Sequence, residues 1–307
     1  MCIHICIYYM DHSDTKIYIP ISTFIKMKFI IIKFLHRLIK NLSLSKILIL
    51  SYPVGFLYYF LTPISNIKLN KRKKNITNYS SLRIKINYVK YWIETIWLSK
   101  EGYESQIFQN VEIINEDEVK KLNRNFDSFI IALPHVGNWE FAIPMGKPLN
   151  LNLLAVAEPL SDTNILNWFT DLRESLGCKI ILGGKGQNTY QKLSDHLDEG
   201  YHVCLLADRH VGKSGIGVEF FNQLAAFPKG PVALSLEKQV PIIPAAFLKI
   251  DNKYKLVFGK PFIVPHFEND AQSIQHGLKV LSKELEKLIL LDPNQWHSIQ
   301  PVWTSEY

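Results

Sequence analysis

The second part of the chain alternates short apolar runs with helical stretches, and this alternation constrains the fold more than any other feature. Runs suited to strands lie at 128–133, 151–156, 179–182, 203–207, 218–221, 242–248 and 255–259. Stretches suited to helices lie at 139–145, 163–176, 189–197, 230–238 and 272–290. Strands that alternate with helices are typical of an α/β domain built on one sheet. We therefore predict an α/β fold for this part of the chain.

The charge is divided unevenly along the chain. Residues 1–100 contain 16 Lys and Arg against 3 Asp and Glu, whereas residues 101–307 contain 19 against 25. A basic segment of this kind usually binds anionic lipid or nucleic acid. With 47% hydrophobic residues the chain is not disordered, and 21% charged residues spread along it argue against a polytopic membrane protein. Four cysteines without paired spacing fit a reducing compartment and no zinc site.

Residues 1–26 fit no targeting pattern. They have no basic start, no long apolar core and no small-residue cleavage site, so we expect no secretory signal peptide. A clearer pattern begins at Met27. Residues 1–26 are therefore treated as a doubtful N-terminal extension. A peptide from this stretch in the mass spectrum of the native protein would disprove that expectation.

Residues 27–78 are predicted to form a helical segment that interacts with a membrane. Residues 28–40 place basic side chains at helical spacing among aliphatic ones, the pattern of an amphipathic interfacial helix. Residues 47–61 carry no charge but are only about fifteen long, and spanning takes roughly 20. We expect them to lie in the interface or to re-enter it, with a buried core helix as the alternative. An aromatic-rich core helix is expected within 79–108.

A dense basic cluster follows the apolar stretch. Its members are Lys68, Lys71, Arg72, Lys73 and Lys74. Such a cluster beside an apolar segment is typical of binding to anionic headgroups. Nucleic acid is the weaker interpretation, because the flanking residues are aliphatic and no nucleic-acid-binding motif surrounds the cluster. A solvated run of charges is the remaining alternative.

One histidine and one carboxylate stand out in the α/β part. His135 follows the apolar run 128–133 directly, and Glu140 comes five residues later. A carboxylate at this distance can fold back to an imidazole, fix its tautomer and leave the other ring nitrogen to take a proton from a hydroxyl. Taken alone the pair is weak, because a structural histidine is the ordinary alternative.

Three sequence blocks strengthen the assignment. They are HVGNWE at 135–140, LADR at 206–209 with GVEFF at 217–221, and FPKGPVAL at 227–234 with VPIIPA at 240–245. In this order they resemble the lysophospholipid acyltransferase superfamily, in particular its lipid A late acyltransferases and phosphatidylinositol mannoside acyltransferases. The stretches AEPL at 157–160 and RESLG at 173–177 resemble the mannoside branch.

This resemblance implies a fold and an activity. The fold would be glycerolipid acyltransferase-like, a mixed sheet flanked by helices, with an acyltransferase domain over 79–307. The reaction would move a fatty acyl chain from acyl-CoA or acyl carrier protein to a hydroxyl of a membrane glycolipid. Neither a metal nor another cofactor would take part, and no nucleic acid is expected. The enzyme would sit on the cytoplasmic face of the plasma (inner) membrane, peripheral or monotopic.

The resemblance also implies roles for particular residues. His135 would be the general base and Glu140 its orienting partner. Backbone N–H groups of 137–139 would stabilise the oxyanion. The expected substrate-binding residues are Asn138, Glu158, Arg173, Asp208, Arg209, Glu219, Lys229 and Gly230. Of these, Asp208 and Glu219 are candidate second carboxylates near the site. The two arginines would hold an anionic headgroup or donor phosphates, because a guanidinium matches phosphate geometry.

A purely structural role remains the alternative for several of these residues. Arg173 fits a surface salt bridge, Asp208 a turn cap and Glu219 a solvent-facing strand position. His210 and Asn222 depart from the family pattern, which leaves the acceptor open. The alternatives for the whole protein are a lipid A late acyltransferase, a thioesterase or lipid hydrolase, and a non-catalytic peripheral lipid-binding protein. A GxSxG elbow is missing from the sequence, which argues against a serine hydrolase.

Overall fold

The computed structural model describes residues 32–39, 41–100, 102–103, 107, 111–159, 162–184, 186–210, 215–297 and 299–306. The doubtful extension 1–26 and the expected start at Met27 lie outside these residues. So do both ends of the predicted basic helix 28–40, whose described part, residues 32–39, is helical.

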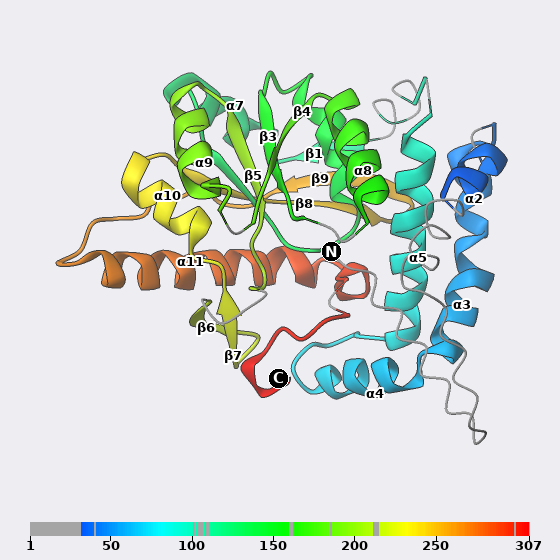
Figure 1. The fold of residues 1–307 in the computed structure, drawn as a ribbon. Helices are drawn as coiled ribbons and strands as arrows, with labels where there is room; N and C mark the ends of the chain where they lie inside the picture. The colour runs from blue at the N-terminus through cyan, green and yellow to red at the C-terminus, as the bar shows by residue number, and fades with distance from the viewer. Residues whose placement is uncertain are drawn as a thin grey trace.

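A seven-stranded sheet forms the centre of the body, in the order β1-β9-β8-β2-β5-β3-β4 (Figure 1). Its strands are β1 (Val111–Ile114), β2 (Ile130–Leu133), β3 (Leu153–Ala157), β4 (Cys178–Leu182), β5 (His202–Leu206), β8 (Ile242–Ile250) and β9 (Lys253–Phe258). The strands from β8 to β4 in this order are mutually parallel. By contrast, β9 runs antiparallel to β8, and β1 runs parallel to β9. The predicted mixed α/β sheet is confirmed.

Helices cover both faces of the sheet. One face packs against α9 (Thr189–Asp198), α10 (Gly230–Lys238) and α11 (Asp270–Leu290). The other packs against α5 (Ser81–Leu98), α7 (Glu116–Asn125), the 3-10 helix η2 (Trp139–Gly146) and α8 (Thr163–Ser175). Along β2, Ile130 and Ala132 enter the first core while Ile131 and Leu133 enter the second. Both faces are buried, which explains why the strand reads as a continuous apolar run.

The N-terminal helices form a separate layer beside α5. They are α2 (Leu44–Ile49), α3 (Ser51–Leu61), α4 (Pro63–Lys71) and the 3-10 turn η1 (Arg72–Lys74). In Figure 1, α3 runs alongside α5. A Cβ on Gly55 of α3 would lie 2.6 Å from the Cα of Ile86 on α5, so the absence of a side chain permits this close approach.

The apolar stretch is longer than the sequence indicated. Residues Leu44–Leu61 are long and apolar enough to cross a membrane by length and composition, and no other stretch in the described part of the chain is. Only 22% of it is buried within the protein. This exposure disfavours the alternative of a buried core helix.

A small hairpin lies outside the main sheet and accounts for one departure from the family pattern. It pairs β6 (Ile216–Phe220) with β7 (Gln223–Phe227). The two turn residues, Phe221 and Asn222, both have positive φ. Asn tolerates this conformation better than most residues, so Asn222 fits a position that Gly would also fill. Strands β1 and β7 and helix α7 were missing from the sequence prediction.

Arg72 departs from its predicted role in the basic cluster. Its guanidinium is buried, donates from Nε and Nη2 to the two carboxylate oxygens of Glu306, and lies 5.3 Å from the centre of the Trp303 ring. It thus fastens η1 to the C-terminal segment and is not available to headgroups. Lys68 and Lys71 are exposed, as is Lys74, so a basic surface remains.

Candidate active site

The topology brings His135 and Asp208 together. Strands β2 and β5 are parallel neighbours, and their last residues, Leu133 and Leu206, are paired in register. Each of the two polar residues lies two positions beyond its strand. The carboxyl ends of parallel strands meet at one edge of the sheet, which is where α/β proteins commonly bind ligands. This pairing had not been predicted from the sequence.

His135 and Asp208 form a buried pair. Nδ1 of the imidazole lies 2.5 Å from Oδ1, and the backbone N–H of His135 donates to Oδ2 at 3.0 Å. The indole N–H of Trp296 donates to the same Oδ2 at 2.7 Å. Burial raises the pKa of the Asp208 carboxyl, but the contacts with His135 and Trp296 outweigh it and lower that pKa to about 2.

The charge on Asp208 determines the tautomer of His135. An ionised carboxylate only accepts hydrogen bonds, so Nδ1 carries the proton and Nε2 keeps its lone pair. His135 also lines the large cavity beside the sheet. The geometry therefore provides an imidazole whose basic nitrogen is free to take a proton from a bound hydroxyl.

Glu140 does not contact the imidazole, which corrects the prediction that it orients His135. Its buried carboxylate accepts from Nη2 of Arg173 at 2.7 Å, from Nε at 3.0 Å and from the hydroxyl of Tyr91 at 3.2 Å. The reason is local: the amide oxygen of Asn138 caps η2 at the N–H of Glu140. That helix directs Glu140 toward α5 and α8, away from Asp208.

Arg173 forms a buried, bidentate ion pair with Glu140. Burial lowers the pKa of the guanidinium, but the adjacent Glu140 carboxylate outweighs it, and the pKa is raised overall. A bidentate Arg–carboxylate pair fixes both side chains. Both residues line the cavity. Of the two interpretations of Arg173, the salt bridge is the one observed, although it is buried and not on the surface. Headgroup binding by Arg173 is not what the contacts favour.

Two backbone N–H groups in the turn after His135 donate to backbone carbonyls of other segments. The N–H of Gly137 donates to the carbonyl of Gln295 at 2.9 Å, and the N–H of Asn138 donates to the carbonyl of Phe247 at 3.0 Å. These two N–H groups are already engaged, which corrects their predicted role as oxyanion donors. Gly137 has φ +62°, and a Cβ there would lie 1.8 Å from the carbonyl oxygen of Phe247.

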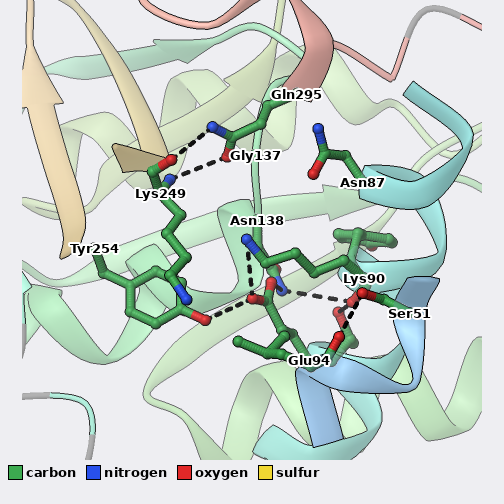
Figure 2. A network of polar contacts seen from close by, with 12 residues as sticks. Ser51, Asn87, Lys90, Glu94, Gly137, Asn138, Lys249, Tyr254 and Gln295 are labelled. Atoms are coloured by element: carbon green, nitrogen blue, oxygen red, sulfur yellow. Dashed lines mark hydrogen bonds and ion pairs between the residues drawn. The ribbon is translucent and has the colours of Figure 1, made fainter. Parts of the chain in front are cut away.

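Asn138 also has a structural role where substrate binding was predicted. Its buried amide nitrogen donates to the Glu94 carboxylate at 3.0 Å, and the hydroxyl of Tyr254 donates to the other oxygen at 2.6 Å. Figure 2 shows both side chains directed at Glu94. Asn138 is thus held in a buried network that joins α5, η2 and β9, and it does not line the large cavity.

A cavity of about 450 Å³ opens beside His135, between the sheet and the helices η2 and α8. Most of the side chains that line it are apolar. On the strands they are Ile131, Leu133, Leu153, Ala155, Cys204 and Leu206, and on the helices Ala142, Ile143, Leu166 and Phe169. Among the polar lining residues, His135, Glu158 and Arg209 follow the carboxyl ends of β2, β3 and β5. A space with this division suits a ligand with a long apolar part and one reactive polar group.

Of the other predicted binding residues, some line the cavity and some do not. Glu158, Arg209 and Gly230 line the cavity. Lys229 is exposed beside Gly230 but does not line it. Glu219 does not line it either: its exposed carboxylate pairs with Lys283 of α11 at 3.0 Å. The solvent-facing alternative for Glu219 is therefore the one observed.

The sequence prediction missed the C-terminal contributors to the site. Trp296 contacts Asp208, and the ring of His297 donates from Nε2 to the carbonyl of Gly137 at 2.7 Å. Burial lowers the pKa of His297 to about 4, so this ring is neutral. Among the described residues, no group of His, Cys, Asp or Glu is arranged to hold a metal ion. A tryptophan next to a histidine after the last helix was the only available signal.

Comparison with known proteins agrees with this geometry. A family profile described as bacterial lipid A biosynthesis acyltransferase matches residues 84–305. This range includes His135, Asp208, all residues that line the cavity, Trp296 and His297. The chain belongs to this family. It is therefore an acyltransferase, and the resemblance found in its sequence blocks is confirmed.

Individual relatives show which members of the family the chain is similar to. The chain is 26% identical over 225 residues to a phosphatidylinositol mannoside acyltransferase of Mycolicibacterium smegmatis, covering 72% of this chain and 71% of that one. It is 27% identical over 181 residues to a protein of the same name from Mycobacterium tuberculosis, covering 58% and 55%. Both names describe enzymes that acylate a glycolipid.

Proposed function

We propose that the chain transfers a fatty acyl group from acyl-CoA or acyl carrier protein to a hydroxyl of a membrane glycolipid, with His135 as the general base. The observation that carries the proposal is the free Nε2 of an Asp208-held imidazole at the polar end of an apolar cavity. The similarity to phosphatidylinositol mannoside acyltransferases supports a phosphatidylinositol mannoside-like acceptor.

The proposed reaction uses the pair twice. Nε2 of His135 takes the proton of the acceptor hydroxyl while its oxygen attacks the thioester carbonyl, and Asp208 stabilises the imidazolium that forms. The tetrahedral intermediate then collapses, the C–S bond breaks and the new ester remains. The imidazolium returns its proton to the departing thiolate. No acyl-enzyme is formed in this scheme, and no metal or other cofactor is required.

The cavity divides the substrates between its two ends. The donor's hydrocarbon chain would occupy the apolar part, since burying each methylene is favourable by about 0.8 kcal/mol. Arg209 lines the polar end, where it donates to the side-chain oxygen of Gln300. A guanidinium at this place suits a phosphate of the donor or of the acceptor headgroup. Glu158 and Gly230 complete the proposed binding residues at this end.

A membrane-docking surface supports a lipid acceptor. The exposed apolar side chains of α3 and α4 are Tyr52, Val54, Phe56, Leu57, Phe60, Leu61, Ile64 and Ile67. An apolar surface of this kind marks an interaction site, and here Lys68, Lys71 and Lys74 adjoin it. Apolar contact with acyl chains and basic contact with anionic headgroups together fit the cytoplasmic leaflet of the inner membrane.

The packing of α3 favours binding in the interface over spanning. One side of α3 is fixed against α5 through Gly55, and α4 begins with Pro63 immediately after α3 ends. A helix that keeps one side on the body and exposes the other lies along a surface. The chain would thus be monotopic, with the enzyme's body held at the leaflet that contains its acceptor.

The decisive experiment supplies both substrates to the purified full-length chain. Vesicles contain either phosphatidylinositol mannoside or a lipid A precursor, palmitoyl-CoA or palmitoyl-acyl carrier protein is added, and mass spectrometry detects the acylated lipid. We expect one acyl chain to be added to the mannoside. His135→Ala should reduce turnover by about 10²–10⁴-fold, the usual contribution of a general base. His276→Ala, an exposed histidine on α11, serves as the control.

Each other outcome identifies an alternative. Acylation of the lipid A precursor alone would replace the proposed acceptor. Release of free fatty acid without lipid product would indicate a hydrolase. Turnover by His135→Ala equal to that of the wild type would refute the role of the imidazole, and no turnover with any acceptor would favour a lipid-binding protein.

Docking is tested separately by flotation with anionic vesicles. Phe56 and Phe60 are exposed and their ring centres are 4.7 Å apart on α3. Replacing both with Ser should reduce the vesicle-bound fraction by at least about tenfold, since burial of each ring contributes about 1.5–3 kcal/mol. Phe267→Ser removes an exposed ring from another part of the body and should leave binding unchanged. Equal vesicle binding by the wild type, the double variant and Phe267→Ser would exclude this surface as the membrane-docking site.

A further inference from the structure

The segment 295–297 lies across the turn that carries His135. Trp296 and Val136 form an antiparallel bridge, the backbone N–H of His297 donates to the carbonyl of His135 at 2.7 Å, and the carbonyl of Gln295 accepts from Gly137. The segment is itself fixed to β8, because the side-chain amide of Gln295 bonds both backbone groups of Lys249 (Figure 2). The C-terminal part of the chain thus supports the turn from outside the cavity.

Trp296 extends this support to the buried pair. Its ring is fully buried, and its indole N–H donates to Oδ2 of Asp208 at 2.7 Å. The other carboxylate oxygen, Oδ1, faces Nδ1 of His135. The backbone N–H of His135 is the second donor to Oδ2. Two donors on one oxygen fix the rotation of the carboxylate, so the remaining oxygen is directed at the imidazole.

Trp296 does not line the cavity, and its indole N–H bonds Asp208, so we expect its side chain to act on the reaction through Asp208. We propose that Trp296 is a positioning residue for the acyl transfer proposed above: its indole N–H holds the Asp208 carboxylate in the orientation that keeps the proton on Nδ1 and the lone pair on Nε2 of His135. Without this donor, Oδ2 keeps only the backbone N–H of His135, so the carboxylate is held less firmly and the tautomer of the imidazole is less strictly fixed.

The chain offers a matched control in the same aromatic cluster. Trp303 is also buried, and its ring centre is 6.1 Å from that of Trp296. Its indole N–H also donates at 2.7 Å, but to the backbone carbonyl of Phe220. Replacing either tryptophan with Phe keeps an aromatic ring and removes one buried N–H donor. Both substitutions therefore remove one buried donor, but only Trp296 contacts Asp208, whereas Trp303 lies beside the Arg72 guanidinium.

The first test compares Trp296→Phe and Trp303→Phe in the vesicle assay. For Trp296→Phe we expect kcat to fall about 10- to 100-fold with KM unchanged, the loss typical of one hydrogen bond to a charged group. Trp303→Phe should keep kcat within about twofold of the wild type, although both variants lower Tm. Equal kcat values for the two variants would overturn the proposal.

A second test uses Asp208→Asn as the background. If Trp296 acts through the carboxylate, adding Trp296→Phe to Asp208→Asn should lower kcat no further. Additive losses would show that Trp296 acts by another route and would refute the proposal. If Trp296→Phe does not fold, benzothienylalanine at position 296 replaces only the N–H with sulfur and keeps the bicyclic shape.

A third measurement needs no substrate and so separates this inference from the proposed function. In ¹⁵N-histidine-labelled protein, the NMR signals of His135, assigned by their loss in His135→Gln, report the tautomer. We expect the Nδ1–H form in the wild type and in Trp303→Phe, and a mixture in Trp296→Phe. An unchanged tautomer in Trp296→Phe refutes the positioning role even if acyl transfer is established. A changed tautomer without acyl transfer would refute only the proposed function.

Discussion

Asp208→Asn tests which carboxylate orients His135. The substitution keeps the size of the side chain and removes its charge. Because the N–H groups of Trp296 and of the His135 backbone both point at Oδ2, the amide oxygen of Asn must take that place. The NH₂ group then faces Nδ1, which becomes the acceptor, and the proton moves to Nε2. The base is lost, and we expect kcat to fall about 10⁴-fold, as for a wrong tautomer in a Ser-His-Asp triad.

Glu140→Gln is the matched substitution at the other carboxylate. Glu140 is fully buried, and its partner Arg173 is largely so. Removing the charge leaves a guanidinium unpaired in the interior, which costs about 3–5 kcal/mol of stability. Because Glu140 does not contact the imidazole, the kcat of the molecules that remain folded should fall far less than in Asp208→Asn.

The assay measures steady-state acyl transfer and urea unfolding on the same preparations, so that kcat is corrected for the folded fraction. Asp208→Asn should lose activity and retain most of its stability, whereas Glu140→Gln should lose stability first. A loss of about 10⁴-fold in folded Glu140→Gln, with Asp208→Asn near wild type, would refute the geometric argument and restore the assignment made from sequence spacing.

Two further predictions concern stability. Gly137→Ala should prevent correct folding, because its Cβ meets the Phe247 carbonyl, whereas Gly177→Ala, which shares positive φ but has open space, should cost only about 1–2 kcal/mol in urea unfolding. Burial lowers the pKa of both His202 and His297 to about 4. The unfolded chain binds these protons from about pH 6.5 downward and the folded chain only near 4, so the unfolding free energy should fall by up to about 3 kcal/mol per histidine over that range. A urea midpoint that is equal at pH 7 and pH 4.5 would contradict this.

Local patterns in the sequence sufficed for the sheet and its buried strands. Runs such as 128–133 are apolar throughout because both faces of β2 are covered, and that property is visible in one dimension. Strand β1 was missed because its residues are half-buried at the sheet edge, and β7 because it belongs to a short hairpin. Glu112 interrupts the apolar run of β1, and β7 carries only the four-residue run 224–227.

Sequence reasoning named His135, Asp208 and Arg209 but did not predict their contacts. His135 stood out because it follows a strand, and Asp208 and Arg209 because their block resembles the family, yet the order of strands in the sheet decides which strand ends adjoin. β2 and β5 are neighbours in space although β3 and β4 separate them in the chain. Arg72 shows the same limit: its neighbours in sequence are lysines on a surface, while its partner Glu306 comes from the opposite end of the chain.

The five-residue interval between His135 and Glu140 has a structural consequence other than mutual contact. Glu140 is placed by η2, which starts at Asn138, and its carboxylate fastens that helix to Arg173 on α8 and to Tyr91 on α5. All three elements contribute residues to the wall of the cavity that His135 also lines. A longer or shorter interval would move the wall relative to Nε2. In the proposed mechanism, the motif couples the base to the cavity beside it, and Glu140 acts on the shape of the site while Asp208 acts on its chemistry.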